Sequence, residues 1–252
     1  MENYTKLYEG KTKIVYDYSA SFVKLYFKDD ITAGDGTKHD AKEGIGEYSW
    51  LVATHCFSLL NRNNIATHYI NSSQSRYITA LRMDKILPLE VVVRRVATGS
   101  LLGRTMHQEG DWFTPLMVEF FMKCDMLHDP LVDPEFVVYA EKKYKTPYGQ
   151  MEDTATNAFV VLEKAFSQHK YQLMDLKVEF GVRNNNLLII DDITPGSLRL
   201  WPYKGDTLTP QKNALDQLDK TGMTDKQLYR EGKDLDTVVT AYKNVAAITA
   251  TF

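Results

Sequence analysis

The most informative part of this sequence is a pair of runs, Tyr171-Gln-Leu-Met-Asp-Leu-Lys-Val-Glu-Phe180 and Leu187-Leu-Ile-Ile-Asp-Asp-Ile193. Both are rich in apolar and β-branched residues, and the polar segment Gly-Val-Arg-Asn-Asn-Asn between them has the composition of a turn. The two runs therefore predict a hairpin that closes the core. Since side chains on a strand alternate between its two faces, we expect Lys177 and Glu179 on one face, with Asp191 opposite on the partner strand.

Strands and helices flank this hairpin without the regular alternation of a parallel sheet. The pattern of apolar and turn residues predicts a hairpin over 11–27, strands over 68–70, 77–81, 91–96 and 116–122, helices over 48–60, 101–108 and 152–168, and C-terminal helices from the capping pattern Thr224-Asp-Lys-Gln227 and after Asp234. Residues 29–47, which hold four glycines and four aspartates, are predicted to form a long surface loop. This order of elements indicates an α+β fold.

Composition excludes several classes of protein. The 252 residues carry 30 Lys and Arg against 33 Asp and Glu, a net charge of −3 that provides no general attraction to nucleic acid or to an anionic membrane. No signal peptide or membrane-spanning run is evident, and the two cysteines, Cys56 and Cys124, form neither a disulfide framework nor a metal cluster. We expect a cytoplasmic protein in which Cys56 and His55, on the apolar helix over 48–60, belong to the core.

Lysines near the N-terminus are the first candidates for a chemical role. In Tyr8-Glu-Gly-Lys-Thr-Lys13, Gly10 would let the backbone approach a phosphate, while Lys11 and Lys13 supply positive charge. The stretch matches neither a Walker loop nor a dinucleotide fingerprint. A polar strand start with solvated lysines is the alternative.

The carboxylates of the closing hairpin are the second candidates. Glu179 and Asp191 could hold a magnesium ion that bridges ATP phosphates, because this ion takes one or two carboxylates in addition to phosphate and water oxygens. A cross-strand ion pair is the alternative. Lys177 lies among apolar neighbours, where an unpaired charge is costly, and this favours a functional site.

Arginines form the third group. Arg94 and Arg95 end an apolar strand and must point to opposite faces, so only one of them is expected to be functional, and Arg199 follows the closing hairpin. Ser100 is expected to cap the helix over 101–108, whose free N–H groups could receive an anion. With no zinc-binding cluster and no nucleophile elbow, the residues indicate a magnesium-dependent enzyme that handles phosphate.

Several stretches also carry a family resemblance. They are Leu7-Tyr-Glu-Gly-Lys-Thr-Lys-Ile-Val-Tyr16, Asp30-Ile-Thr-Ala-Gly-Asp-Gly36, Pro88–Ser100, His128-Asp-Pro130, Asp175-Leu-Lys-Val-Glu-Phe-Gly181, Asp191-Asp-Ile-Thr-Pro195 and Arg199-Leu-Trp201. In this order they resemble the phosphoribosylaminoimidazole-succinocarboxamide (SAICAR) synthetase family, over residues 7 to 201.

This resemblance implies a two-lobed α+β fold similar to that of protein kinases. An antiparallel lobe over 1–87 and a larger lobe over 88–252 would hold ATP in the cleft between them. It also implies a carbon–nitrogen ligase of purine biosynthesis, in which ATP activates the carboxylate of carboxyaminoimidazole ribonucleotide and the amine of L-aspartate displaces phosphate. A homo-oligomer is compatible with the family, although no patch in the sequence is decisive.

The resemblance also implies roles for individual residues. Lys11 and Lys13 would contact ATP phosphates; Val15, Val23 and Ile86 would enclose adenine; Glu179 and Asp191 would hold Mg²⁺; Arg94, Ser100 and Arg199 would bind the 5'-phosphate of the ribonucleotide; Lys123 and Lys177 would stabilise charge on the transferring phosphoryl group and the carboxylate; and Asp35 and Asp129 would contact substrate.

The chain departs from the family pattern at a few positions. Gly196 stands where an acidic residue is usual, Asp192 follows Asp191 where the usual pair is Asp-Glu, and Cys124 replaces a polar residue beside Lys123. None of these removes a proposed phosphate or metal ligand. A small-molecule kinase and a non-catalytic nucleotide-binding module are the competing hypotheses. A requirement for aspartate in phosphate release would exclude the kinase, and the presence of Lys123, Lys177, Glu179 and Asp191 argues against the module.

Overall fold

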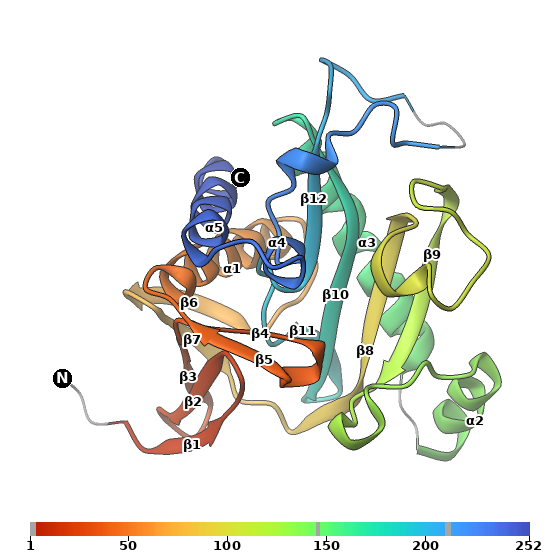
Figure 1. Ribbon diagram of the computed structural model, residues 1–252. Helices are drawn as coiled ribbons and strands as arrows, with labels where there is room; N and C mark the ends of the chain where they lie inside the picture. Colours follow the sequence, from red (N-terminus) through yellow and green to blue (C-terminus); the bar gives the residue numbers. More distant parts are fainter. Residues whose placement is uncertain (1–3, 145–146, 210–212) are drawn as a thin grey trace.

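A computed structural model describes residues 4–144, 147–209 and 213–252 (Figure 1). The strands are β1 (Lys6–Glu9), β2 (Lys13–Asp17), β3 (Phe22–Phe27), β4 (Asp30–Ala33), β5 (Lys38–Ala41), β6 (Tyr69–Gln74), β7 (Tyr77–Leu81), β8 (Lys85–Val96), β9 (Trp112–Met122), β10 (Tyr171–Arg183), β11 (Asn186–Ile190) and β12 (Leu198–Pro202). The helices are α1 (Ile45–Arg62), α2 (Pro134–Tyr144), α3 (Tyr148–Ser167), α4 (Gln227–Arg230) and α5 (Leu235–Thr249).

The N-terminal part of the chain forms an antiparallel sheet in the order β1-β2-β3-β7-β6. One face of α1 packs into the core through Val52, Cys56, Phe57 and Leu60, all fully buried. The predicted hairpin over 11–27 is confirmed by β2 and β3. The predicted helix over 48–60 is also confirmed, since α1 contains it.

The second sheet is built around the long strand β10. On one side it pairs with β8, which pairs in turn with β9. On its other side two short strands share its length: β12 pairs with residues 171–176 and β11 with residues 179–183. The strand on this side of β10 is therefore interrupted, and the chain crosses the gap through residues 191–197.

Helix α3 packs on one face of this second sheet (Figure 1). Its buried residues Phe159 and Leu162 join Leu176 and Val178 of β10 in the main core. Because strand residues alternate, the charged residues of β10 lie on the other face, away from α3. The helix predicted over 152–168 is confirmed, although it begins four residues earlier.

The α+β class is confirmed, and the two C-terminal helices lie beside the N-terminal half of the chain. Helix α5 packs against α1 (Figure 1). The first sheet reaches Leu81 and β8 begins at Lys85, so the boundary at residue 87, which lies within β8, stays a prediction. Among the described helices, none has both the length and the apolar character that a membrane span needs.

Two sequence predictions were wrong around the glycine-rich segments. Residues 29–47 form the hairpin β4–β5 and the start of α1 rather than a loop. Although the segment is polar in composition, the side chains of Ile31, Thr32 and Ala33 in β4 are buried. Residues 101–108 form no α-helix. A single 3₁₀ turn covers Gly99–Leu101, and the Arg104 amide donates to the Leu101 carbonyl at 3.0 Å, a bond across three residues instead of the four of an α-helix.

The helical prediction at Thr224 was also inaccurate. Helix α4 is only four residues long, and its first free amide, that of Gln227, donates to Asp225 at 2.6 Å instead of to a threonine hydroxyl. The longer helix predicted after Asp234 is confirmed as α5, and the Asp234 carboxylate accepts from the Thr237 amide. No helix was predicted at the position of α2.

Gly46, in the first turn of α1, provides a test of this packing. A Cβ at Gly46 would lie 2.5 Å from the Lys28 carbonyl oxygen and 2.6 Å from that of Phe27. We expect Gly46→Ala to lower the free energy of unfolding by about 2 kcal/mol, measured by urea denaturation, because the backbone at Phe27 and Lys28 would have to move to make room for the new methyl group. The control is Gly149→Ala at the start of α3, where a Cβ meets nothing within 4 Å. Equal stability of both variants would contradict the packing described here.

Candidate active site

The segment that crosses the gap between β11 and β12 lies against the charged face of β10. The Lys177 amide donates to the Ser197 carbonyl at 2.7 Å, which fixes the segment to the strand. Asp191, its first residue, has a φ of 67°, in the left-handed region that non-glycine residues seldom occupy. Such backbone strain is common where a side chain has to be aimed at a ligand.

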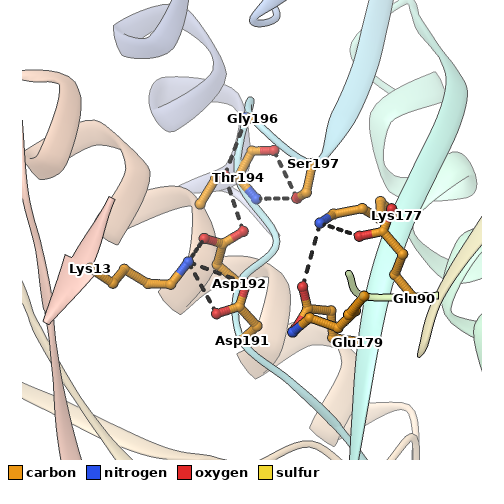
Figure 2. Close-up of polar contacts among 10 residues, drawn as sticks. Lys13, Glu90, Lys177, Glu179, Asp191, Asp192, Thr194, Gly196 and Ser197 are labelled. Carbon is orange, nitrogen blue, oxygen red and sulfur yellow. Dashed lines mark hydrogen bonds and ion pairs between the residues drawn. The ribbon is translucent and has the colours of Figure 1, made fainter. Parts of the chain in front are cut away.

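Lysines and carboxylates alternate around this segment (Figure 2). The Lys177 ammonium lies 2.7 Å from Glu90 and 3.4 Å from Glu179, which also pairs with Lys123. On the other side of the gap, Lys13 of β2 reaches across from the first sheet. Its ammonium lies 3.2 Å from Asp191 and pairs with Asp192 as well. We call these seven residues the charge cluster.

The charge cluster shifts the titration of its members. Burial disfavours the charged form of Lys13 and of Lys177, but the carboxylates beside them outweigh it and raise the pKa of both lysines. Burial and then the charge of Asp191 raise the pKa of Glu179. Burial alone would raise the pKa of Asp191 too, but the lysines, Lys13 first, hold it below its ordinary value. Groups with perturbed pKa values cluster at functional sites, which makes this pair of carboxylates a candidate for one.

A cavity of about 450 Å³ lies against the charge cluster. Lys11, Lys13 and Val15 line it from the first sheet, as the sequence predicted for a common site. Lys123, Lys177, Glu179 and Asp191 line it from the second sheet and its loops. Two predicted residues do not line this cavity. Val23 packs against the main core, and Ile86 is 61% exposed.

A second cavity, of about 620 Å³, adjoins the first. Four residues predicted to bind substrate line it, namely Arg94, Ser100, Arg199 and Asp129. Eight residues line both cavities, and we call them the junction: Lys11, Thr32, Glu90, Asp129, Lys177, Gly196, Ser197 and Lys226. The side chain of Asp35 lies outside what the structure describes, so its predicted role stays a prediction.

Two arginines of the second cavity, Arg94 and Arg199, share one buried acid, Asp175. Arg94 lies 2.7 Å from Glu119 and 3.0 Å from Asp175, and it is 2% exposed. Arg199 pairs with the same Asp175, but its own Nε atom is buried without a hydrogen-bond partner among the described residues. Arg199 therefore keeps donor capacity, whereas Arg94 is largely engaged by protein.

The 3₁₀ turn at Gly99 allows this arrangement. A Cβ at Gly99 would lie 2.6 Å from the Arg199 guanidinium, and the residue has a φ of +60°. Only glycine satisfies both conditions at little cost. The prediction that Arg94 and Arg95 face opposite ways is supported by their partners, since Arg95 instead pairs with Glu163 of α3 at 2.8 Å.

Sequence reasoning missed several members of the site. Asp175 stands opposite both Arg94 and Arg199 in the sheet register, and Glu90 stands opposite Glu179. The alternation of Asp175 with Lys177 and Glu179 was a usable signal for the first of these. Asp192 and Lys226 gave no such signal, because a loop and a distant helix start bring them to the site.

Known proteins resemble this chain in sequence over nearly its full length. The SAICAR synthetase family model matches residues 6–248. A phosphoribosylaminoimidazole-succinocarboxamide synthase of Chloroflexus aurantiacus is 39% identical over 238 residues, covering 93% of this chain and 90% of that protein. The protein of the same name from Sulfurisphaera tokodaii is 37% identical over 240 residues and covers 95% and 96%.

Solved structures resemble it as well. A SAICAR synthetase (Type-2) in complex with ADP superimposes with a TM-score of 0.83 at 28% identity, covering 97% of each chain. A phosphoribosylaminoimidazole-succinocarboxamide synthase of Ehrlichia chaffeensis gives a TM-score of 0.84 at 26% identity, covering 98% of this chain and 99% of that one. Sequence and fold agree, and the chain belongs to the SAICAR synthetase family of purine-biosynthesis ligases.

Proposed function

We propose that this protein joins L-aspartate to the carboxylate of carboxyaminoimidazole ribonucleotide, using ATP and Mg²⁺, and releases SAICAR, ADP and phosphate. The observation that carries the proposal is the pair of adjoining cavities, one beside the charge cluster and one beside the arginines, with a shared junction. Two phosphate-bearing substrates could bind there with their reacting groups together. The proposed enzyme is cytoplasmic and acts on small molecules, without nucleic acid or membrane partners.

ATP is assigned to the first cavity, between lobes that we place at 1–87 and 88–252. Lys11 and Lys13 would contact its phosphates, because Lys13 at the start of β2 and Lys11 in the turn before it both line this cavity. Val15, Val23 and Ile86 are proposed to enclose adenine, with Val15 the best supported since it lines the cavity. The ADP bound to the related Type-2 enzyme supports a nucleotide in this fold.

Glu179 and Asp191 fit a magnesium ion that is shared with ATP. They are two hard oxygen donors that line the same cavity, and the charge of Asp191 contributes to the raised pKa of Glu179. Among the described residues, no group of three or more potential ligands forms a complete protein site. Mg²⁺ commonly takes only one or two carboxylates and completes its shell with phosphate and water oxygens. Bound there, it would neutralise charge on the phosphates.

The ribonucleotide is assigned to the second cavity. Arg199 has an unused buried Nε donor, and Ser100 lies in the 3₁₀ turn beside it, so both could bind the 5'-phosphate. Arg94 would hold Asp175 and Arg199 in place and add positive charge. The anion site proposed here rests on side chains rather than on a helix start, because the helix over 101–108 is absent.

The reacting carboxylate is then placed at the junction. One of its oxygens attacks the γ-phosphorus of ATP, and ADP leaves. The aspartate amine then attacks the activated carboxyl carbon and loses a proton. The bond between this carbon and the phosphate oxygen breaks, and phosphate is released. Lys123 and Lys177 would stabilise the negative charge of these groups, since such transfer depends chiefly on positioning and electrostatics. Asp129 lines both cavities and is proposed to contact substrate, as is Asp35.

Phosphate release tests the reaction itself. With ATP and Mg²⁺ present, we expect release only when both carboxyaminoimidazole ribonucleotide and L-aspartate are added, with product followed by absorbance. Phosphate transfer to the ribonucleotide without aspartate would instead identify a kinase.

Replacement of Arg199 tests the assignment of the second cavity. Arg199→Ala removes a charged contact to phosphate, so we expect the KM for the ribonucleotide to rise roughly 100-fold and that for ATP to change little. Arg95→Ala is the control, because Arg95 pairs with Glu163 and lines neither cavity. A rise of equal size in both KM values for Arg199→Ala would count against the assignment.

Replacement of Asp191 tests the metal site. Asp191→Asn keeps the shape but removes the charge, so we expect at least ten times more Mg²⁺ for half-maximal activity, with the far-UV circular dichroism unchanged. Asp206→Asn, at an exposed pair with Lys170, is the matched control. Unaltered magnesium dependence would remove Asp191 from the metal site.

A further inference from the structure

Lys226 occupies the junction but has no counterion there. It immediately precedes α4 and lines both cavities. Among the described residues it forms no salt bridge and no side-chain hydrogen bond, and the carboxylate that most favours its charge is that of Asp192, which is paired with Lys13. The two lysines proposed to stabilise the transferring groups differ from it: Lys177 pairs with Glu90 and Glu179, and Lys123 pairs with Glu179.

The position of Lys226 is fixed by its backbone. Its amide donates to the Pro195 carbonyl at 3.0 Å, and its own carbonyl accepts from the Tyr229 amide at 3.1 Å. Gly196 lies alongside, where an added Cβ would be 3.9 Å from Lys226 Cδ. Because this chain has no side chain at position 196, nothing from that position competes for the ammonium or fills the space beside it.

The surroundings of Lys226 call for an anionic ligand. Burial, followed by the charges of Arg230 and Lys177, lowers the pKa of Lys226 to about 8. A partly buried cation among other cations is costly until an anion reaches it. The proposed function already assigns the two phosphate-bearing substrates to Lys11 and Lys13 and to the arginines. The third substrate is a dicarboxylate, and its amine has to reach the junction.

We propose that Lys226 binds a carboxylate of L-aspartate and so positions the amine against the activated carboxylate. This inference rests on the proposed function. It gives the amino-acid substrate a specific contact at the junction, supplied by a residue between the two phosphate sites rather than within either of them.

The test is a comparison of KM values in purified full-length protein. Lys226→Met keeps the aliphatic length and removes the charge, so we expect the KM for L-aspartate to rise roughly 50-fold, while those for ATP and the ribonucleotide stay within about threefold. Lys226→Arg, which keeps the charge, should recover most of this loss. The matched control is Lys220→Met, at an exposed pair with Glu109.

Binding of succinate, a dicarboxylate without an amine, provides a readout independent of turnover. We expect it to compete with L-aspartate in the wild type, and its inhibition constant to rise in Lys226→Met by about the same factor. A larger effect on the KM for ATP or for the ribonucleotide, or an unchanged KM for aspartate, would overturn the inference. If the wild type itself shows no dependence on aspartate, the proposed function fails instead. Thermal unfolding of each variant identifies a folding defect, in which case Lys226→Gln replaces Lys226→Met.

Discussion

The pairing of three lysines with four carboxylates is the interaction on which the rest of the structure depends. Lys13 brings the first sheet to the loop after β11, and Lys177 and Lys123 tie β8 and β9 to β10. The more buried members, such as Lys13 and Glu179, would be costly to leave without a partner, because an unpaired ion that is removed from water loses its solvation. If a ligand separates one of these ion pairs, the lysine needs another anion beside it and the carboxylate needs another cation. An arrangement of this kind accepts a metal and phosphate together more readily than either separately.

The interruption opposite β10 explains why the cluster forms at this place. A continuous strand would have used the backbone groups of residues 191–197 in ladder bonds and directed alternate side chains away from the sheet. Because β11 stops at Ile190 and β12 resumes at Leu198, the intervening loop can place Asp191 and Asp192 over Lys13. The core beneath, on the α3 side, is unaffected, since Leu176 and Val178 still pack there.

Much of this could be predicted from the sequence where the signal is local. Alternation along β10 placed Lys177 and Glu179 on one face, and the spacing of apolar residues located α1 and α3. Contacts between distant parts of the chain could not be predicted. Glu90 lies beside Lys177 only because of the register in which β8 pairs with β10. The helix predicted after Ser100 does not form: the Leu102 and Arg104 amides bond carbonyls three residues back, and propensity alone does not distinguish such turns from an α-helix. Val23 and Ile86 were placed by resemblance, and the cavity does not reach them.

The packing of α5 on α1 has a consequence for how the protein is made. Helix α1 leaves the ribosome almost two hundred residues before its partner, so its apolar face has to wait for the end of the chain. Tyr242 of α5 and Lys226 also complete the first cavity. Nascent chains that stop short of these helices would have an incomplete core and an incomplete first cavity, and we expect chaperones and proteases to bind them.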